Sequence, residues 1–290
     1  MAKKTVLITG CSEGGIGWAI AKAYQARGYH VFATLRYPAK AGSVLAGLSD
    51  VDILPLEVTS DESIRQCAAE VETRTAGSLD VLVNNAGADF VMPLLDTSIA
   101  EAKRLYDLNV WAVLALTQAF APMLIKARGA VLNIASINGV LDMAWSGIYN
   151  SSKAAEVSIS ESLRLELAPL GVRVLTAMVG AVHTPIHDKA GALNLPETSY
   201  YQAAQKVIAD QRAGVLKTNS QAVDVTARSL VRDVESGRVG KVWRGGLAST
   251  VRYSVRLLPR GILERAANRV KGLEIVRAAW AGRGKEGKGV

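Results

Sequence analysis

The chain has 290 residues, 49% of them hydrophobic, which is enough for one large α/β domain or two small ones. Two cysteines and three histidines favour neither a disulfide framework nor a histidine-based metal site, so we expect no metal. The net charge of +8 comes from residues 244–290, which hold 11 Lys and Arg against 3 Asp and Glu. Residues 1–243, the body of the chain, hold 23 charges of each sign, which argues against nucleic-acid binding by the body.

The start of the chain has no pattern typical of a targeting segment. Its first apolar run, residues 5–9, is too short for a signal-peptide core, and no run of 18 or more apolar residues predicts a transmembrane helix. We therefore expect a cytoplasmic protein. Contact with a membrane or lipid-droplet surface remains an open question for the basic tail.

Predicted strands and helices alternate from residue 5 to residue 179. The expected strands are 5–9, 30–35, 51–56, 79–83, 130–135 and 172–179, with 239–243 as a candidate seventh. The expected helices are 18–27, which Gly28 would end, then a helix to about residue 75 with a Thr59–Glu62 capping box, 99–126 and 149–167. This alternation predicts an α/β fold, a Rossmann-type doubly wound parallel sheet of about seven strands with helices on both faces.

The chain divides into two parts in this interpretation. Residues 1–243 form a dinucleotide-binding catalytic domain, in which residues 184–218, with weaker patterning and two prolines, are a candidate substrate loop or lid. Residues 244–290 form a basic, amphipathic C-terminal extension.

A glycine-rich turn, residues 10–17, follows the first strand and precedes a helix. Glycines let a ligand approach the backbone closely, and the free amides and dipole of a helix N-terminus favour an anion. The turn therefore predicts a diphosphate site. Glu13 has the wrong charge for that site, and we expect it to point to solvent.

Tyr149 and Lys153 are four residues apart on a predicted helix, so both side chains lie on one face. An ammonium beside a phenol stabilises the phenolate and lowers the tyrosine pKa. Tyr149 is therefore a candidate proton donor or acceptor.

Several motifs together resemble the short-chain dehydrogenase/reductase family over about residues 4–243. They are Thr9-Gly10 with Gly14-Gly15-Ile16-Gly17, Asn84-Asn85-Ala86-Gly87, Asn109, Ser136, and Tyr149 with Lys153, in the family's order and at about its spacing. The turn has one residue more than the usual family turn, which shifts the matching of its glycines by one position. The resemblance implies a nicotinamide-dependent oxidoreductase, and dimers or tetramers are usual in the family.

The resemblance also implies the catalytic group. Ser136 and Tyr149 would hydrogen-bond the substrate carbonyl, with Tyr149 as the proton donor. Lys153 would lower the tyrosine pKa and hold the nicotinamide ribose, and Asn109 would anchor a water that relays protons to Lys153.

The cofactor contacts come from the same comparison. Arg36 at the end of the second strand, where no carboxylate is present, favours NADP(H) over NAD(H). Gly180, Val182 and Thr184 match the segment that contacts the nicotinamide. The remaining expected contacts are Gly10, Ser12, Gly15, Ile16, Gly17, Glu57, Val58, Asn85, Ala86, Gly87, Tyr149 and Lys153.

The tail places apolar residues from Leu263 to Val276 on one helical stripe beside several arginines. Two interpretations remain open: a helix that packs on the body with a solvated basic face, and an interfacial helix on an anionic membrane. The tail and the segment 163–174 resemble fungal reductases similar to NADPH-dependent 1-acyldihydroxyacetone-phosphate reductase, a subgroup that includes ketone reductases of secondary metabolism.

The leading hypothesis is an NADPH-dependent reductase that converts a lipophilic ketone, such as a fungal secondary metabolite, to an alcohol. The alternatives are a 1-acyldihydroxyacetone-phosphate reductase of lipid synthesis, and a catalytically silent NADP-binding or membrane-associated regulatory protein. We expect a small carbonyl or alcohol substrate, no nucleic acid, and a homodimer or homotetramer.

Overall fold

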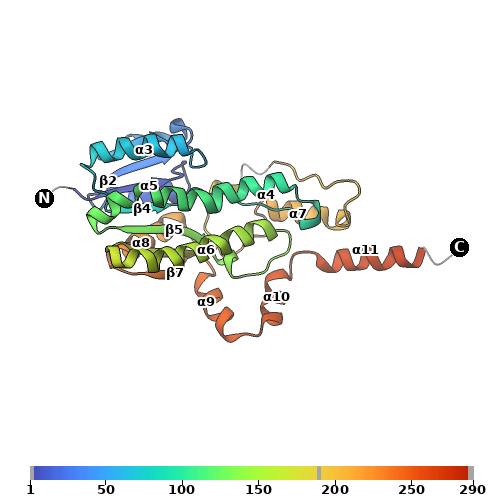
Figure 1. Cartoon of the computed structure of the whole chain (residues 1–290). Helices are drawn as coiled ribbons and strands as arrows, with labels where there is room; N and C mark the ends of the chain where they lie inside the picture. The colour runs from blue at the N-terminus through green and yellow to red at the C-terminus, as the bar shows by residue number, and fades with distance from the viewer. Residues whose placement is uncertain (1–2, 188–190, 287–290) are drawn as a thin grey trace.

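The computed structural model describes residues 3–187 and 191–286, and its centre is a parallel sheet of seven strands (Figure 1). The strand order is β3-β2-β1-β4-β5-β6-β7. The strands are β1 (Thr5–Thr9), β2 (His30–Leu35), β3 (Val51–Pro55), β4 (Val81–Asn84), β5 (Ala130–Ser136), β6 (Arg173–Val179) and β7 (Gly240–Arg244). The predicted fold class and strand number are confirmed.

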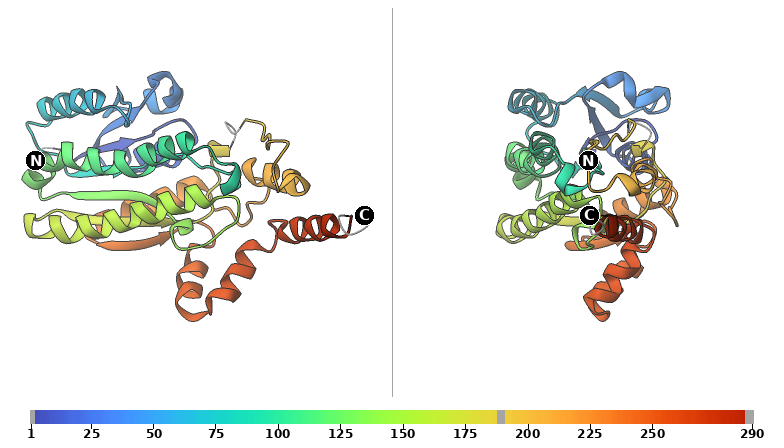
Figure 2. Two further views of the ribbon diagram at one scale, coloured as in Figure 1. Left: turned by 45° about the vertical axis from the view of Figure 1, so that its right-hand side comes forward. Right: turned by 90° about the vertical axis from the view of Figure 1, so that its right-hand side faces the viewer.

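Helices cover both faces of the sheet (Figure 2). On one face α1 (Ile16–Gln25), α2 (Gly42–Ala46) and α8 (Val223–Glu235) pack against the strands, and Ile20 and Leu230 are among the buried contacts. On the other face lie α3 (Asp61–Arg74), α5 (Ala112–Ala127) and α6 (Gly147–Leu167), which contribute Phe120 and Leu163. The strands β1, β5 and β6 are almost wholly buried because each face of the sheet meets a helical layer.

The strand order reverses between β1 and β4, which lie side by side at the centre of the sheet. The chain winds outward in one direction through β2 and β3, and in the other through β5, β6 and β7. Loops that leave the carboxyl ends of β1 and β4 therefore diverge and leave a crevice. In doubly wound folds this switch point binds the ligand.

One predicted helix start is wrong. The N-cap of α3 is Ser60, whose hydroxyl accepts a hydrogen bond from the Ser63 amide at 3.3 Å, and not Thr59. The Thr59 hydroxyl instead donates to the Glu57 carboxylate, and Glu62 pairs with side chains further along the helix. The capping box fails because a serine one position later competes for the same role.

The long helix predicted over residues 99–126 contains an irregular turn. It consists of α4 (Ile99–Tyr106), a π-helical segment over Asp107–Trp111, and α5. The whole segment, Ile99–Ala127, is long and apolar enough to cross a membrane by length and composition. Half of its most apolar window is buried inside the protein, so we interpret it as a core helix of the domain.

The candidate substrate loop, residues 184–218, holds more regular structure than its sequence indicated. Two short 3-10 turns, Pro185–His187 and Gln202–Ala204, precede α7 (Gln205–Arg212). Residues 188–190 of this loop lie outside the described part of the chain. Figure 1 shows α7 at the same end of the molecule as α4.

The tail is not one helix. It forms α9 (Ala248–Leu257), α10 (Arg260–Asn268) and α11 (Leu273–Glu286), drawn in red in Figures 1 and 2. Pro259 precedes α10, and Gly272, with a φ of 70°, ends the turn before α11. The predicted single stripe is wrong because a left-handed glycine and the preceding turn separate its two halves.

Candidate active site

The glycine-rich turn forms one wall of the crevice at the switch point. Gly10 and Gly14 have φ values of 72° and 73°, a region that glycine adopts without steric cost. Gly15 is the N-cap of α1, so the first amides of the helix face the crevice without helical partners. Glu13 is exposed, as expected. Gly14 therefore takes a left-handed conformation in the turn, and Gly15 occupies the N-cap position.

Close backbone packing fixes this turn. A Cβ atom on Gly17 would lie 2.5 Å from Asn85 Nδ2 and 2.8 Å from the Gly10 carbonyl oxygen. The Asn85 side chain donates to the Thr9 carbonyl at 2.8 Å, and the buried Thr9 hydroxyl accepts from the Asn85 and Ala86 amides at 2.9 Å. The segment after β4 is therefore bonded directly to the turn after β1.

The opposite wall is the segment that follows β6. A Cβ atom on Gly14 would come within 3.4 Å of the Pro185 ring, so the two segments face each other across the crevice. Gly180 lies tightly against the Gly246 carbonyl, and the buried Val182 offers its carbonyl oxygen to Lys217 Nζ at 2.7 Å. Thr184 is half-buried beside Pro185.

Arg36 lies where the adenosine end of a dinucleotide is expected. Its Nε is 3.2 Å from Glu57 Oε2, and its guanidinium carbon is 5.6 Å from the centre of the Tyr37 ring. The Arg36 side chain is 62% exposed, so it can exchange a solvated ion pair for a phosphate at small cost. Val58 is buried next to Glu57.

The catalytic candidates gather where β5 ends and α6 begins. Ser136 is the last residue of β5 and is buried, and Tyr149 lies in the first turn of α6. Burial raises the pKa of Tyr149, while Lys153 and a hydrogen bond with Ser136 lower it; the net direction is upward. Tyr149 therefore holds its proton at neutral pH, as a proton donor to a carbonyl requires.

Lys153 is buried deeper than Tyr149 on the same face of α6. Its Nζ donates to the Ile134 carbonyl at 3.0 Å and to Glu156 Oε2 at 2.7 Å. Burial alone would lower the pKa of Lys153, but the carboxylate of Glu156 and the phenol of Tyr149 outweigh it and raise the pKa. The ammonium therefore stays charged.

Asn109 lies in the π-helical segment, which turns its side chain inward. Its amide oxygen accepts from the Ala88 amide at 3.0 Å, and its Nδ2 donates to the Ala88 carbonyl at 3.0 Å and to the Ser152 hydroxyl at 3.1 Å. Single π turns are frequent at functional sites. Within the described residues Asn109 makes no direct hydrogen bond to Lys153, and its water relay stays a prediction.

A small hydrophobic cluster lies on the substrate side of this group. It joins the segment after β4, the loop before Tyr149, and residues 193–209, with Val276 of α11 packed against it. Trp145 is its largest member. The indole Nε1 donates to the Lys271 carbonyl at 2.8 Å, and the ring meets Tyr201 edge-on at 5.1 Å. The tail thus packs against the loop that precedes Tyr149.

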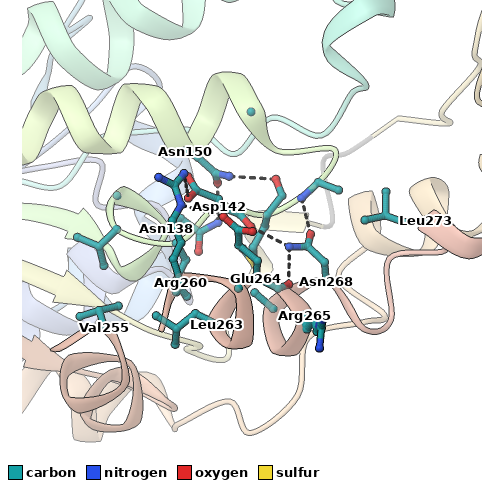
Figure 3. A pocket seen from close by; sticks show the side chains of 18 of the residues that line it. Asn138, Asp142, Asn150, Val255, Arg260, Leu263, Glu264, Arg265, Asn268 and Leu273 are labelled. Atoms are coloured by element: carbon teal, nitrogen blue, oxygen red, sulfur yellow. Dashed lines mark hydrogen bonds and ion pairs between the residues drawn. The ribbon is translucent and has the colours of Figure 1, made fainter. Parts of the chain in front are cut away.

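A large groove lies next to this site but is separate from it (Figure 3). Its volume is about 1280 Å³, and it runs between residues 138–154 and the tail helices. Asp142 and Asn268 bridge it, since Asn268 Nδ2 donates to the Asp142 carbonyl at 2.9 Å and Arg260 pairs with the Asp142 carboxylate. Tyr149 does not line the groove, so we do not assign the reacting carbonyl to it.

Two residues of the site were missed from the sequence. Glu156 lies three residues after Lys153, a spacing that places it on the same helical face and was itself a signal. Trp145 gave no signal, because its partner Lys271 is 126 residues away in the chain.

Comparisons with known proteins agree with this geometry. Residues 4–194 match the family model described as short chain dehydrogenase. The chain is 51% identical over 274 residues to the short-chain dehydrogenase cctT of Talaromyces islandicus, covering 93% of this chain and 96% of that protein. It is 40% identical over 221 residues to the NADPH-dependent 1-acyldihydroxyacetone phosphate reductase of Schizosaccharomyces pombe, covering 74% of each.

A solved structure shows the same fold. A short-chain dehydrogenase from Streptomyces avermitilis superposes with a TM-score of 0.74 at 28% sequence identity. The match covers all of this chain and 98% of that one. The tail is therefore included in the part of the chain that has a structural counterpart.

Proposed function

The chain belongs to the short-chain dehydrogenase family, and from that premise we propose that it is an NADPH-dependent reductase of a lipophilic ketone. The observation that carries the proposal is the meeting of Ser136, Tyr149 and Lys153 at the carboxyl end of β5, beside the switch-point crevice. The family membership supports an oxidoreductase. The choice of NADPH and of a ketone is our inference from the residues.

The crevice fits a dinucleotide. A Cβ atom on Gly10 would lie 3.0 Å from Ala86 Cα, and one on Gly17 still closer to Asn85, so the turn has no room for larger residues at these two positions. The first amides of α1 would hold the diphosphate, and Arg36 the 2′-phosphate. Gly180, Val182 and Thr184 would border the nicotinamide. When bound, the cofactor supplies the hydride.

The protein's own groups supply the proton and the polarisation. The Ser136 and Tyr149 hydroxyls lie close enough for Ser136 to lower the pKa of Tyr149, and both can donate to one carbonyl oxygen. As negative charge develops on that oxygen, Tyr149 transfers its proton to it. The buried ammonium of Lys153 stabilises the phenolate that remains.

Replacing Tyr149 with Phe tests the proposal. The variant retains the ring and loses the proton donor, so we expect ketone-dependent NADPH oxidation to fall at least about a hundredfold while NADPH binding stays unchanged. Activity is measured against a panel of long-chain acyl ketones, steroids and aromatic polyketide ketones. Normal turnover by Y149F would refute the assignment, and loss of NADPH binding would point to a structural role.

A second candidate substrate is favoured by two lysines near the site. Asp89, whose charge acts on Tyr149 and Lys153, acts also on Lys217 and Lys271, and burial lowers the pKa of both lysines. These ammonium groups suit an anionic ketone such as 1-acyldihydroxyacetone phosphate, the substrate in the name of the 40% identical relative. A higher kcat/KM for the phosphate than for its dephosphorylated form would favour this substrate.

A further inference from the structure

Lys153 has three N–H groups, and the protein itself occupies two of them. The Ile134 carbonyl accepts one at 3.0 Å and Glu156 Oε2 accepts another at 2.7 Å. Among the described residues no third acceptor hydrogen-bonds Nζ. One N–H therefore remains for whatever enters the crevice.

The Glu156 carboxylate has no other partner in the described part of the chain. It is 1% exposed, and Lys153 is 7% exposed. A buried carboxylate without its cation would be strongly destabilised, so the two charges hold each other in place. The short i,i+3 link along α6 leaves the lysine head little freedom to rotate.

We propose that Glu156 is a positioning residue for the proposed reductase: by its ion pair it anchors the Lys153 ammonium beneath β5 and directs the remaining N–H toward the face that Tyr149 shares. The inference rests on the proposed function. It adds a residue that supports the lysine through its charge, in a place where the Asn109 side chain makes no direct bond to the lysine. Glu156 itself touches neither substrate nor cofactor.

The charges around the pair give the direction of a test. Tyr149 and Asp89 face Lys153 along with Glu156, and all three favour its charged form. If Glu156 is made neutral, Lys153 stays buried with less compensation and its pKa falls. While Lys153 keeps its charge, the Tyr149 pKa falls too, because a negative charge near the phenol is removed. Once Lys153 loses its proton, the phenolate loses its stabilising cation and Tyr149 is a poorer partner in the reaction. Both changes move the loss of ketone reduction at alkaline pH to a lower pH.

The test is the pH profile of ketone reduction by E156Q, with NADPH affinity measured by fluorescence over the same range. The alkaline limb of the profile is the range over which ketone reduction is lost as the pH rises. We expect this limb to lie at a pH about one unit or more lower in E156Q than in the wild type, since an opposite charge at this distance shifts a pKa by about 1–3 units. NADPH affinity should weaken over the same lower range, because a neutral Lys153 no longer attracts the cofactor.

The matched control is E161Q on the same helix. Glu161 also forms an i,i+3 pair, with Arg164 at 3.1 Å, but these two side chains are 30% and 32% exposed. The alkaline limb of E161Q should coincide with that of the wild type. A limb in E156Q that also coincides with the wild type would overturn the inference.

Two further variants keep the outcome unambiguous. If E156Q does not fold, E156D takes its place, because it keeps the carboxylate but shortens the side chain by one methylene. We expect E156D to shift the alkaline limb in the same direction by a smaller amount. An unshifted limb in E156D would again overturn the inference. Y149F is measured alongside. Normal turnover by Y149F defeats the proposed function itself, whereas inactive Y149F with an unshifted E156Q defeats only the role of Glu156.

Discussion

The two sides of the crevice are built in different ways. On the side of the glycine-rich turn, the backbone of Gly10 and Gly17 packs against the Asn85 side chain at distances that leave no room for a Cβ atom. On the substrate side, side chains from distant segments meet in one small cluster around Trp145, and the tail closes it from outside. The first side tolerates almost no change of residue, while the second can be rebuilt by altering a few side chains. This difference is what we expect of a family whose members share a cofactor but act on different substrates.

The largest effect is expected from crowding the cofactor side. In G17V the new side chain meets Asn85 Nδ2 and the Gly10 carbonyl, and relief of such a clash typically costs about 1–3 kcal/mol. We expect NADPH affinity to fall about 10- to 100-fold and urea stability to drop. Fluorescence titration and urea unfolding measure these two quantities. Normal NADPH binding by G17V would contradict the claim that this side of the crevice tolerates almost no change of residue.

A smaller effect on the same side is expected from Arg36. In R36A the expected charge-assisted hydrogen bonds to a 2′-phosphate are lost, and we expect about tenfold weaker NADPH binding. NADH binding and stability should hardly change, because the Arg36–Glu57 pair is solvated. Titration with both cofactors measures the ratio. Equal loss for NADPH and NADH would contradict the assignment of NADPH.

On the substrate side, W145F tests the link between the tail and the loop before Tyr149. The variant keeps most of the ring but leaves the Lys271 carbonyl without its donor, at a cost of about 1 kcal/mol. We expect the KM for ketone to rise about fivefold, with NADPH affinity unchanged. Steady-state kinetics and fluorescence titration separate the two. Weaker NADPH binding with an unchanged KM for ketone would place Trp145 on the cofactor side and contradict the comparison.

The smallest effect is expected in the tail itself, and it is the control for G17V. Gly261 lies inside α10, and a Cβ atom there meets nothing within 4 Å. G261A should therefore leave kinetics and NADPH binding unchanged and stabilise the helix by up to about 1 kcal/mol. Thermal unfolding measures the gain. A loss of activity in G261A would show that the tail contributes to activity in a way that the contacts of Gly261 do not explain.

The sequence by itself determined the sheet, the turn and the shared helical face of Tyr149 and Lys153. These features depend on local rules: apolar runs predict buried strands, a glycine turn needs positive φ, and Tyr149 and Lys153 share a face because of helical spacing. The capping box failed within the same local rules, since Ser60 competes with Thr59 at one helix start.

Only the tertiary structure decided what surrounds those residues. The π turn that directs Asn109 inward, the partner that Lys271 offers to Trp145, and the burial that makes the Lys153–Glu156 pair strong all depend on packing between segments far apart in the chain. The strength of a charge pair depends on the dielectric around it, and burial sets that dielectric. Glu161 and Glu156 have the same spacing from their partners on α6, yet only the fold leaves one pair partly exposed and places the other, fully buried, beneath β5.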